Sequence, residues 1–91
     1  MLVKYFADIR KLSGRLDEQL EAVAPATLRG LLDELSRRHG PPFRERVYER
    51  DGLSQTLIVL VNGRHVEHLA GLDTPLGRED VVAIFPVVAG G

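Results

Sequence analysis

Leucines at helical spacing form the clearest hydrophobic pattern in the chain. Apolar side chains recur at positions i, i+3, i+4 and i+7, with charged residues between them, as is typical of a helix that packs one face against a core. These leucines are Leu28, Leu31, Leu32 and Leu35. Thr27 precedes them and can accept a hydrogen bond from a first-turn amide, so it is the expected N-cap. The sequence Gly40-Pro41-Pro42 is expected to end the helix.

Four other segments have the alternation or the composition of β-strands. They are residues 2–7, 16–23, 56–61 and 81–87. In the second segment, alternation places Glu18 and Leu20 on one face. The run 56–61 is apolar throughout, which predicts a central strand buried on both faces. The last segment, 81–87, is expected to be a late strand at the edge of the sheet.

Turn signals separate these segments. Asn62-Gly63 favours a tight hairpin, because both central residues of a type I′ turn need a positive φ angle. Further turns are expected at Asp51-Gly52 and at 74–77. Residues 8–15 are predicted to be a polar connection that contains a turn glycine, and residues 43–50 a single helical turn.

The order of these elements predicts the fold. Two strands, one main helix and further strands within 91 residues favour an α+β roll of the ubiquitin-like (β-grasp) kind, with the helix packed across a mixed sheet. A chain of this length holds one domain. We assign residues 1–86 to the β-grasp domain and residues 87–91 to a flexible C-terminal tail.

Composition excludes several classes of function. The formal net charge of −1 offers no basic surface for non-specific nucleic-acid binding. The longest apolar run is far shorter than a membrane span, and the chain opens without a secretion signal, so we expect a cytoplasmic protein without a membrane role. Because cysteine is absent, the chain has no disulfides and no side-chain thiol that could carry sulfur.

The sequence ends in Gly90-Gly91, shortly after the last predicted strand. Glycine has no Cβ, so such a tail can enter a channel too narrow for other residues. The Gly91 carboxylate is therefore the candidate reactive group. If the tail is fully extended, its five residues reach roughly 17 Å from the domain, which is enough to enter a buried site of a partner enzyme.

Several sequence blocks resemble the MoaD/ThiS-type sulfur carriers. The blocks are Tyr5-Phe6-Ala7-Asp8-Ile9-Arg10, Leu60-Val61-Asn62-Gly63-Arg64, Gly71-Leu72-Asp73-Thr74-Pro75-Leu76 and Asp80 to Gly91. The last block is the most specific and is similar to the small subunit of molybdopterin synthase. One departure is Val87, which follows Pro86 where that family often has a second proline.

The resemblance implies a β-grasp fold and a chemistry that depends on partners. A ubiquitin-activating-type adenylating enzyme would use ATP to activate Gly91, and a sulfurtransferase would supply the sulfur of a Gly91 thiocarboxylate. The larger molybdopterin synthase subunit would then receive the tail and pass the sulfur to a pterin precursor. The chain has no phosphate-binding Gly-x-x-x-x-Gly-Lys-Ser/Thr motif, so we expect no bound cofactor and no enzyme activity of its own.

The resemblance also implies a partner-binding surface formed by Phe85, Pro86, Phe6 and Arg10. For Phe85, alternation along the last strand leaves two interpretations open, a docking residue or a core residue. His65 and His68 lack the further ligands of a zinc site, so no metal site is expected. The basic residues between 37 and 50 are interrupted by acidic ones and are expected to form a solvated face.

Three alternatives to molybdopterin synthesis stay open. The activated Gly91 could be attacked by a lysine of a target protein, which would make the chain a ubiquitin-like modifier. Its sulfur could instead go to thiamin or another sulfur-containing metabolite. A β-grasp module that binds partners through its sheet and never activates its terminus is the third alternative.

Overall fold

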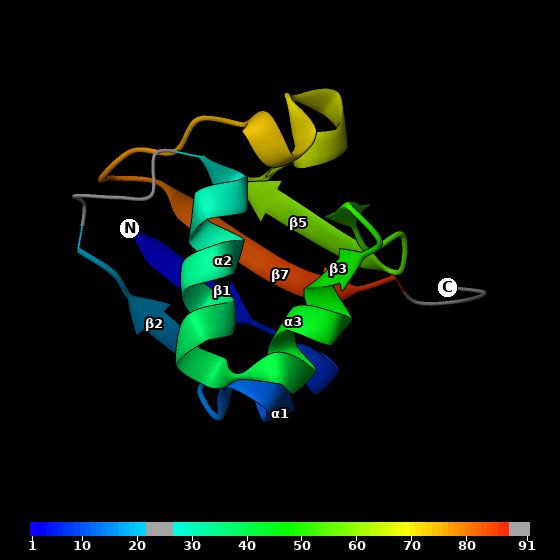
Figure 1. Ribbon diagram of the computed structural model, residues 1–91. Coiled ribbons are helices and arrows are strands. Elements are labelled where there is room, and N and C mark those ends of the chain that lie inside the picture. The colour runs from blue at the N-terminus through cyan, green and yellow to red at the C-terminus, as the bar shows by residue number, and fades with distance from the viewer. Residues whose placement is uncertain (22–26, 88–91) are drawn as a thin grey trace.

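The computed structural model describes residues 1–21 and 27–87, which form a mixed sheet with helices packed on one side (Figure 1). In chain order the elements are β1 (Leu2–Tyr5), α1 (Ala7–Ser13), β2 (Asp17–Gln19), α2 (Leu28–His39), α3 (Pro41–Val47), β3 (Tyr48–Glu49), β4 (Gly52–Leu53), β5 (Leu57–Val61), β6 (Arg64–His65), the 3-10 turns η1 (Val66–His68) and η2 (Gly71–Asp73), and β7 (Val81–Pro86). The predicted α+β roll is confirmed, with α2 as the main helix across the sheet.

The main sheet has the strand order β2-β1-β7-β5-β6, and β3 pairs with β4 in a separate hairpin. β7 runs parallel to β1 and antiparallel to β5. The prediction of a late edge strand is therefore wrong, since the last strand is the central one. Its alternation explains this position: Val82 and Ile84 are buried against the helices, while both edges of the strand are paired.

β5 is an inner strand, but only one of its faces is fully buried. Leu57, Val59 and Val61 point into the core, whereas Ile58 and Leu60 are half-buried on the opposite face of the sheet. The prediction of burial on both faces is wrong because the helices cover only one side (Figure 1). An apolar row is thus left on the outer face of the sheet.

The core lies between that helix layer and the sheet. The four leucines of α2 predicted to face the core are fully buried, together with Val3, Val59 and Ile84 from the three inner strands. The helix ends at Gly40, whose φ of 93° favours glycine. Burial of the leucine stripe is what fixes α2 across the sheet.

Two helices lie where the sequence predicted a connection and a single turn. α1 occupies most of the predicted connection 8–15, because Ile9 is fully buried and Leu12 packs partly against the core, an i, i+3 pair on one helix face. Gly14 ends α1 with a φ of 74°, as expected of the turn glycine. α3 extends the predicted turn to seven residues because Phe43 and Val47 bury an i, i+4 pair.

The tight turns are largely as predicted. Asn62 and Gly63 have φ angles of 52° and 84°, as the hairpin between β5 and β6 requires. The turn expected at 74–77 lies instead at 77–80, where the Asp80 amide donates to the Gly77 carbonyl at 3.2 Å. β2 is shorter than the predicted strand, of which residues 22–23 lie outside the described residues. Glu18 and Leu20, predicted to lie on one face, are both buried.

Thr27 caps α2 as predicted, and its replacement has a measurable expected cost. Its Oγ1 accepts a hydrogen bond from the Gly30 amide at 3.2 Å. Thr27→Ala leaves that amide without its partner and should lower the free energy of unfolding by about 1 kcal/mol. Urea unfolding of the two proteins checks this, with Thr27→Ser, which keeps the hydroxyl, expected to retain most of the stability.

Candidate functional site

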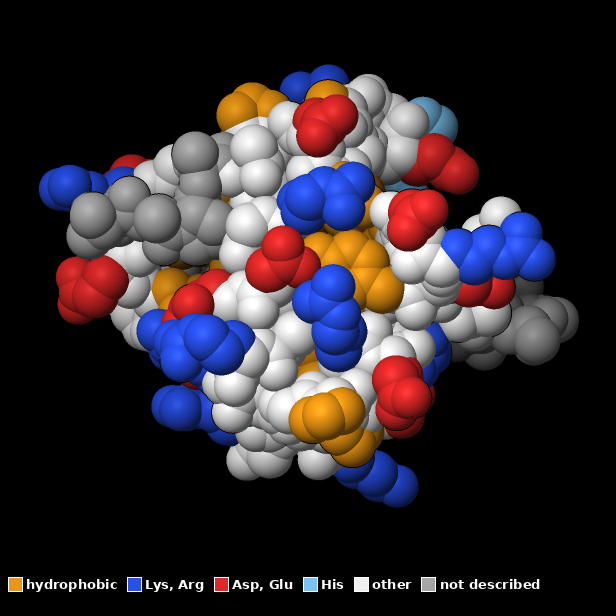
Figure 2. Space-filling view, in the orientation of Figure 1, with side chains coloured by type: hydrophobic (Ala, Val, Ile, Leu, Met, Phe, Trp, Pro, Cys, Tyr) orange, Lys and Arg blue, Asp and Glu red, His pale blue; other side chains and the backbone are white. Residues whose placement is uncertain are grey.

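A small apolar surface lies at the end of the sheet where β1 and β7 finish. Its residues line an open pocket and are Phe6, Ala7, Leu60, Ala83, Phe85 and Pro86. We call these six residues the docking surface. The helix side of the molecule is different: Figure 2 shows acidic and basic side chains interspersed over much of that face.

Strand register explains why these residues lie together. β7 directs Val82 and Ile84 toward the helices, so Ala83 and Phe85 point to the outer face. Leu60 of β5 lies opposite Ala83 in the antiparallel pairing. Phe85 is half-buried on this outer face rather than in the helix-packed core, so the core interpretation of Phe85 is not the one the structure shows.

The structure brings together all four predicted residues that lie within the described part of the chain. Phe6 is 39% exposed, and its ring meets the Phe85 ring edge to face, with 6.0 Å between their centres. The Arg10 guanidinium carbon lies 5.8 Å from the centre of the Phe6 ring. Pro86 completes the same surface. Parallel pairing of β1 with β7 is what places two distant sequence segments side by side.

The chain leaves the docking surface toward its predicted reactive residues. Val87, directly after Pro86, is 48% exposed, and its amide donates to the Thr56 carbonyl at 2.9 Å. Gly90 and Gly91 lie outside the described residues, so the predicted reactive terminus and the boundary of the tail stay predictions. The last described residue nevertheless fixes where the path toward them begins.

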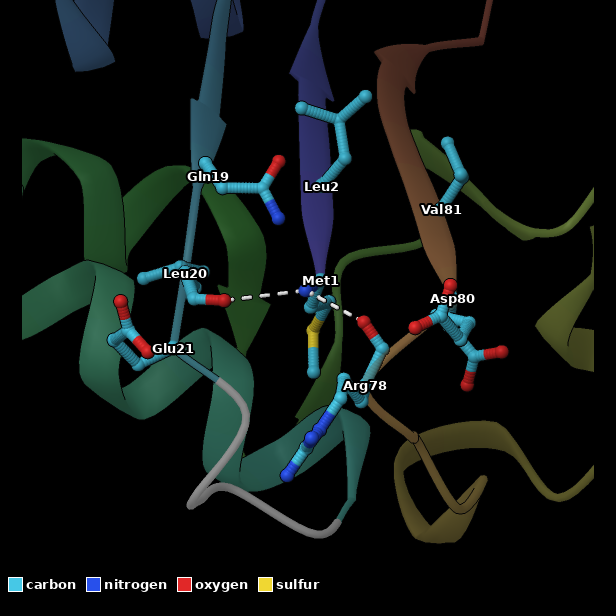
Figure 3. Close-up of a pocket in the computed structure, with 9 residues that line it drawn as sticks. Met1, Leu2, Gln19, Leu20, Glu21, Arg78, Asp80 and Val81 are labelled. Atoms are coloured by element: carbon cyan, nitrogen blue, oxygen red, sulfur yellow. Dashed lines mark hydrogen bonds between the residues drawn. The ribbon is translucent and has the colours of Figure 1, made fainter.

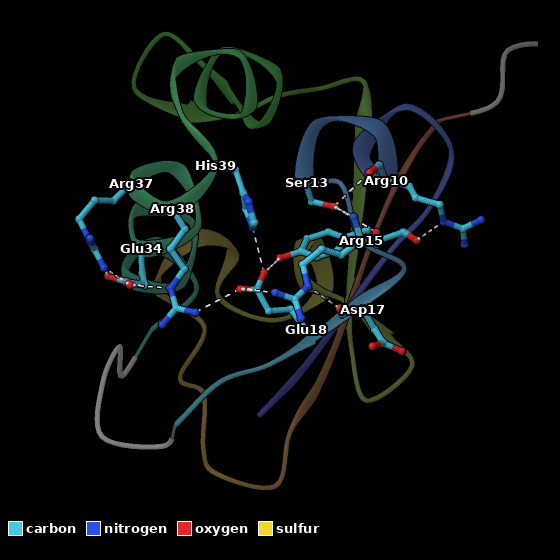
Figure 4. Close-up of polar contacts among 10 residues, drawn as sticks. Arg10, Ser13, Arg15, Asp17, Glu18, Glu34, Arg37, Arg38 and His39 are labelled. Carbon is cyan, nitrogen blue, oxygen red and sulfur yellow. Dashed lines mark hydrogen bonds and ion pairs between the residues drawn. The ribbon is translucent and has the colours of Figure 1, made fainter.

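A buried carboxylate that the sequence analysis did not single out as a site residue ties β2 to β1 and to α2. Glu18 is 4% exposed and accepts from Tyr5 Oη at 2.7 Å and from Arg38 at 3.1 Å, and its Oε1 lies 2.9 Å from His39 Nε2 (Figure 4). Burial alone would raise the pKa of Glu18, but these hydrogen bonds outweigh it and hold the pKa below its usual value. Burial, and then the hydrogen bond to the same carboxylate, raise the pKa of Tyr5.

This network corrects the prediction for the basic segment 37–50. Arg38 and His39 do not simply face water, because both contact the buried Glu18. Arg46 likewise has a defined role in the structure, donating to Asp8 at 2.6 Å. Solvated charge is the better description of Arg37, whose side chain is 71% exposed.

A second pocket lies at the opposite end of the sheet (Figure 3). It is bordered by Leu2 and Val81 at the start of β1 and β7, and by charged side chains. The Met1 amino group donates to the carbonyls of Leu20 at 3.1 Å and Arg78 at 2.8 Å. None of the predicted site residues lies there, so the docking surface is the site that unites the sequence predictions.

The two histidines weighed as metal ligands in the sequence lie close together. His65 Nδ1 accepts from the Glu67 amide at 3.0 Å, and the His65 and His68 ring centres are 5.9 Å apart. No cluster of three or more His, Cys, Asp or Glu side chains suited to a metal occurs in residues 1–21 and 27–87. Over the same ranges, no helix has the length and apolarity needed to cross a membrane.

Comparison with known proteins assigns the class. The chain belongs to the ThiS family, which it matches over residues 3–91. It is 33% identical to small archaeal modifier protein 3 of Haloferax volcanii over 89 residues, covering 98% of this chain and 96% of that one. It is 41% identical over 66 residues to a proposed sulfur carrier of Archaeoglobus fulgidus, covering 71% of this chain and 74% of the relative. The chain is thus a ubiquitin-like sulfur carrier or modifier by family.

Solved structures share the fold over nearly the whole chain. A protein of Pyrococcus furiosus proposed as subunit 1 of the molybdopterin converting factor aligns with a TM-score of 0.75 at 37% identity, covering 96% of this chain and 95% of that one. A chain in the BexX/CysO complex of Amycolatopsis orientalis aligns with a TM-score of 0.84 at 27% identity, covering 99% and 98%. The latter relative is therefore known in a complex.

Proposed function

We propose that this protein is a sulfur carrier whose Gly91 forms a thiocarboxylate, and that it donates this sulfur in molybdopterin synthesis as the small subunit of the synthase. The observation that carries the proposal is the docking surface, which lies beside the base of the segment leading to Gly90 and Gly91. A partner that binds this surface would receive the tail at a defined starting point. Membership in the ThiS family supports the same chemistry.

The first stage activates the terminal carboxylate. A Gly91 carboxylate oxygen attacks the α-phosphorus of ATP on the adenylating partner, and pyrophosphate leaves. The resulting acyl-adenylate carries a good leaving group, which the carboxylate lacks. A hydrosulfide equivalent delivered by a sulfurtransferase then attacks the carbonyl carbon, the carbon–oxygen bond to AMP breaks, and AMP departs with the bonding electron pair. The products are a Gly91 thiocarboxylate, AMP and a proton.

In the second stage the larger synthase subunit binds the docking surface and takes up the tail. Sulfur of the thiocarboxylate attacks a carbon of the pterin precursor, and an oxygen substituent leaves that carbon with the bonding electron pair, so that a thioester joins Gly91 to the pterin. Water then attacks the thioester carbonyl, the bond between the Gly91 carbonyl carbon and sulfur breaks, and the products are a pterin-bound thiol, the ordinary Gly91 carboxylate and a proton. The similarity to the Pyrococcus furiosus protein supports molybdopterin as the destination. ATP and the sulfur donor belong to the partners, and the carrier supplies the tail and the surface that positions it.

Adding one alanine after Gly91 should abolish thiocarboxylate formation, because the reactive carboxylate then sits on a side-chain-bearing residue that a glycine-sized channel excludes. The measurement is intact-protein mass spectrometry after incubation with the adenylating enzyme, ATP and the sulfur donor. Wild-type protein should gain the mass of one oxygen exchanged for one sulfur, located at Gly91. The extended chain should still bind the enzyme through its docking surface. A sulfur gain on the extended chain, or none on the wild type with an enzyme active on another carrier, would contradict the proposal.

Protein modification is the second candidate function, and the similarity to small archaeal modifier protein 3 over 98% of the chain favours it. In that case a lysine amine of a target attacks the activated Gly91 carbonyl and AMP leaves. The two functions separate when the thiocarboxylated carrier is mixed with the larger synthase subunit and the pterin precursor. Sulfur in the pterin product indicates the synthase role, whereas a Gly91 isopeptide bond on target proteins, formed in a separate mixture of carrier, adenylating enzyme, ATP and target proteins, indicates the modifier role.

A further inference from the structure

Arg46, on α3, occupies a position that the proposed chemistry does not yet use. Its side chain is 22% exposed and reaches away from the helix to α1 and to the turn before β5. Arg46 Nε donates to the Asp8 carboxylate of α1 at 2.6 Å, and another of its guanidinium nitrogens donates to Thr56 Oγ1 at 2.9 Å. One guanidinium therefore joins α3 to the first turn of α1 and to the residue before β5.

Each of the two contacts lies close to the docking surface. Asp8 is two residues after Phe6, in the first turn of α1. Thr56 precedes β5, and its carbonyl accepts the amide of Val87, two residues after Phe85. The Thr56 hydroxyl also lies 2.9 Å from the hydroxyl of Ser54, which is 8% exposed. The Thr56 hydroxyl is thus held by Arg46 and Ser54, while the Thr56 carbonyl binds the amide of Val87, the first residue of the tail.

We infer that Arg46 is a positioning residue, which fixes the base of the tail relative to the docking surface by holding Thr56 against Asp8. This inference rests on the proposed function, since it assigns a role in presenting the Gly91 carboxylate. A planar guanidinium suits the task because its donors have fixed directions and can bond two acceptors at once. The tail then leaves Val87 in a constant direction when a partner covers the docking surface.

Arg44 on the same helix provides a matched comparison. Its guanidinium pairs with Asp33 of α2 at 3.3 Å and lies 4.8 Å from the centre of the Tyr48 ring. Arg44 is thus also an ion-paired arginine of α3, but within residues 1–21 and 27–87 no hydrogen bond or ion pair joins it to the docking surface or to Thr56. A general effect of losing an α3 arginine would appear in both variants, whereas an effect on the tail should appear only for Arg46.

Arg46→Ala should slow sulfur transfer to the partner at least about tenfold at saturating carrier concentration, because small displacements of a reacting group have large effects on rate. The concentration that gives the half-maximal rate should change less than about twofold, since the apolar docking residues are retained. Arg44→Ala should match the wild type in both quantities. In a Thr56→Val background, Arg46→Ala should have little additional effect, because the shared contact is already absent.

Amide hydrogen exchange of Val87 tests the inference without any sulfur chemistry. In the unmodified protein, Arg46→Ala and Thr56→Val should each speed exchange of the Val87 amide about three- to tenfold, and Arg44→Ala should not. The inference would be overturned if the Val87 amide of Arg46→Ala exchanged at the wild-type rate and the variant also transferred sulfur at the wild-type rate. If Arg46→Ala does not fold, Thr56→Val decides by the same two measurements. If wild-type protein forms no thiocarboxylate, the proposed function fails, and Val87 exchange still decides whether Arg46 holds the tail base.

Discussion

Phe85→Ala should weaken binding of the adenylating enzyme at least about 30-fold, because an aromatic ring within a small apolar interface commonly contributes about 2 kcal/mol or more of binding free energy. The ring contacts Phe6 and lies beside the base of the tail. Its removal leaves a partner pocket unfilled and takes away the support of the neighbouring ring. Isothermal titration calorimetry with the enzyme gives the dissociation constants of the two proteins.

Leu16→Ala is the matched control for this experiment. Leu16 is also a large apolar residue and is 63% exposed, but it lies in the connection between α1 and β2, outside the docking surface. Its replacement should leave the affinity within about twofold of the wild type. Phe85→Ala should cost only about 1–2 kcal/mol of folding stability, since the ring lies outside the core, and circular dichroism checks this. Equal affinity of Phe85→Ala and wild-type protein would show that partners bind elsewhere.

Local patterns predicted the parts of the fold that depend on nearby residues. The leucine stripe of α2, its Thr27 cap and the Asn62-Gly63 hairpin are all present. α1 was missed because its core face consists of little more than Ile9 and Leu12, too few apolar positions to stand out among polar neighbours. Its helical state depends on burying Ile9 against the sheet, a tertiary contact that a short window of sequence does not contain.

The sequence likewise predicted some features of the candidate site and not others. Phe6, Arg10, Phe85 and Pro86 were named from the resemblance, but alternation alone did not decide whether Phe85 faces the core. The helices decide it, because they cover the face on which Val82 and Ile84 are buried and leave Phe85 on the opposite face. The parallel pairing of β1 with β7 then places Phe6 beside Phe85. Arg46 was counted among solvated charges, since nothing in its local sequence reveals that Asp8, 38 residues away, is its partner.

Glu18 is the strongest example of a residue whose role depends on distant partners, and Glu18→Gln should lower the free energy of unfolding by about 2–4 kcal/mol. The glutamine keeps the shape but presents an NH₂ group to side chains that donate, so the buried Tyr5 hydroxyl and the Arg38 guanidinium lose a charged acceptor. Urea unfolding at neutral pH measures the loss. Glu45→Gln, a change of the same chemistry at an exposed site on α3, should alter stability by less than about 0.5 kcal/mol. A loss no larger in Glu18→Gln than in this control would contradict the prediction.

The same carboxylate makes stability depend on pH on the acid side. Hydrogen bonds keep the pKa of Glu18 lower in the folded protein than in the unfolded chain, so the unfolded chain takes up the proton first as the pH falls. The stabilisation by Glu18 is therefore complete well above about pH 4.3, the ordinary value for a glutamate, and is lost as the pH falls through the folded-state pKa. Glu34, with a pKa of about 2 beside Arg37 and Arg38, and Asp80, with a pKa lowered by Asn62 and the Gly77 amide, add to the same acid sensitivity.

Because Glu18→Gln retains those two groups, the stability difference between wild type and variant should shrink below about pH 4.3, which isolates the contribution of Glu18. Unfolding curves from pH 7 to pH 2 test this, and a difference that stays constant over that range would show that Glu18 does not titrate with folding.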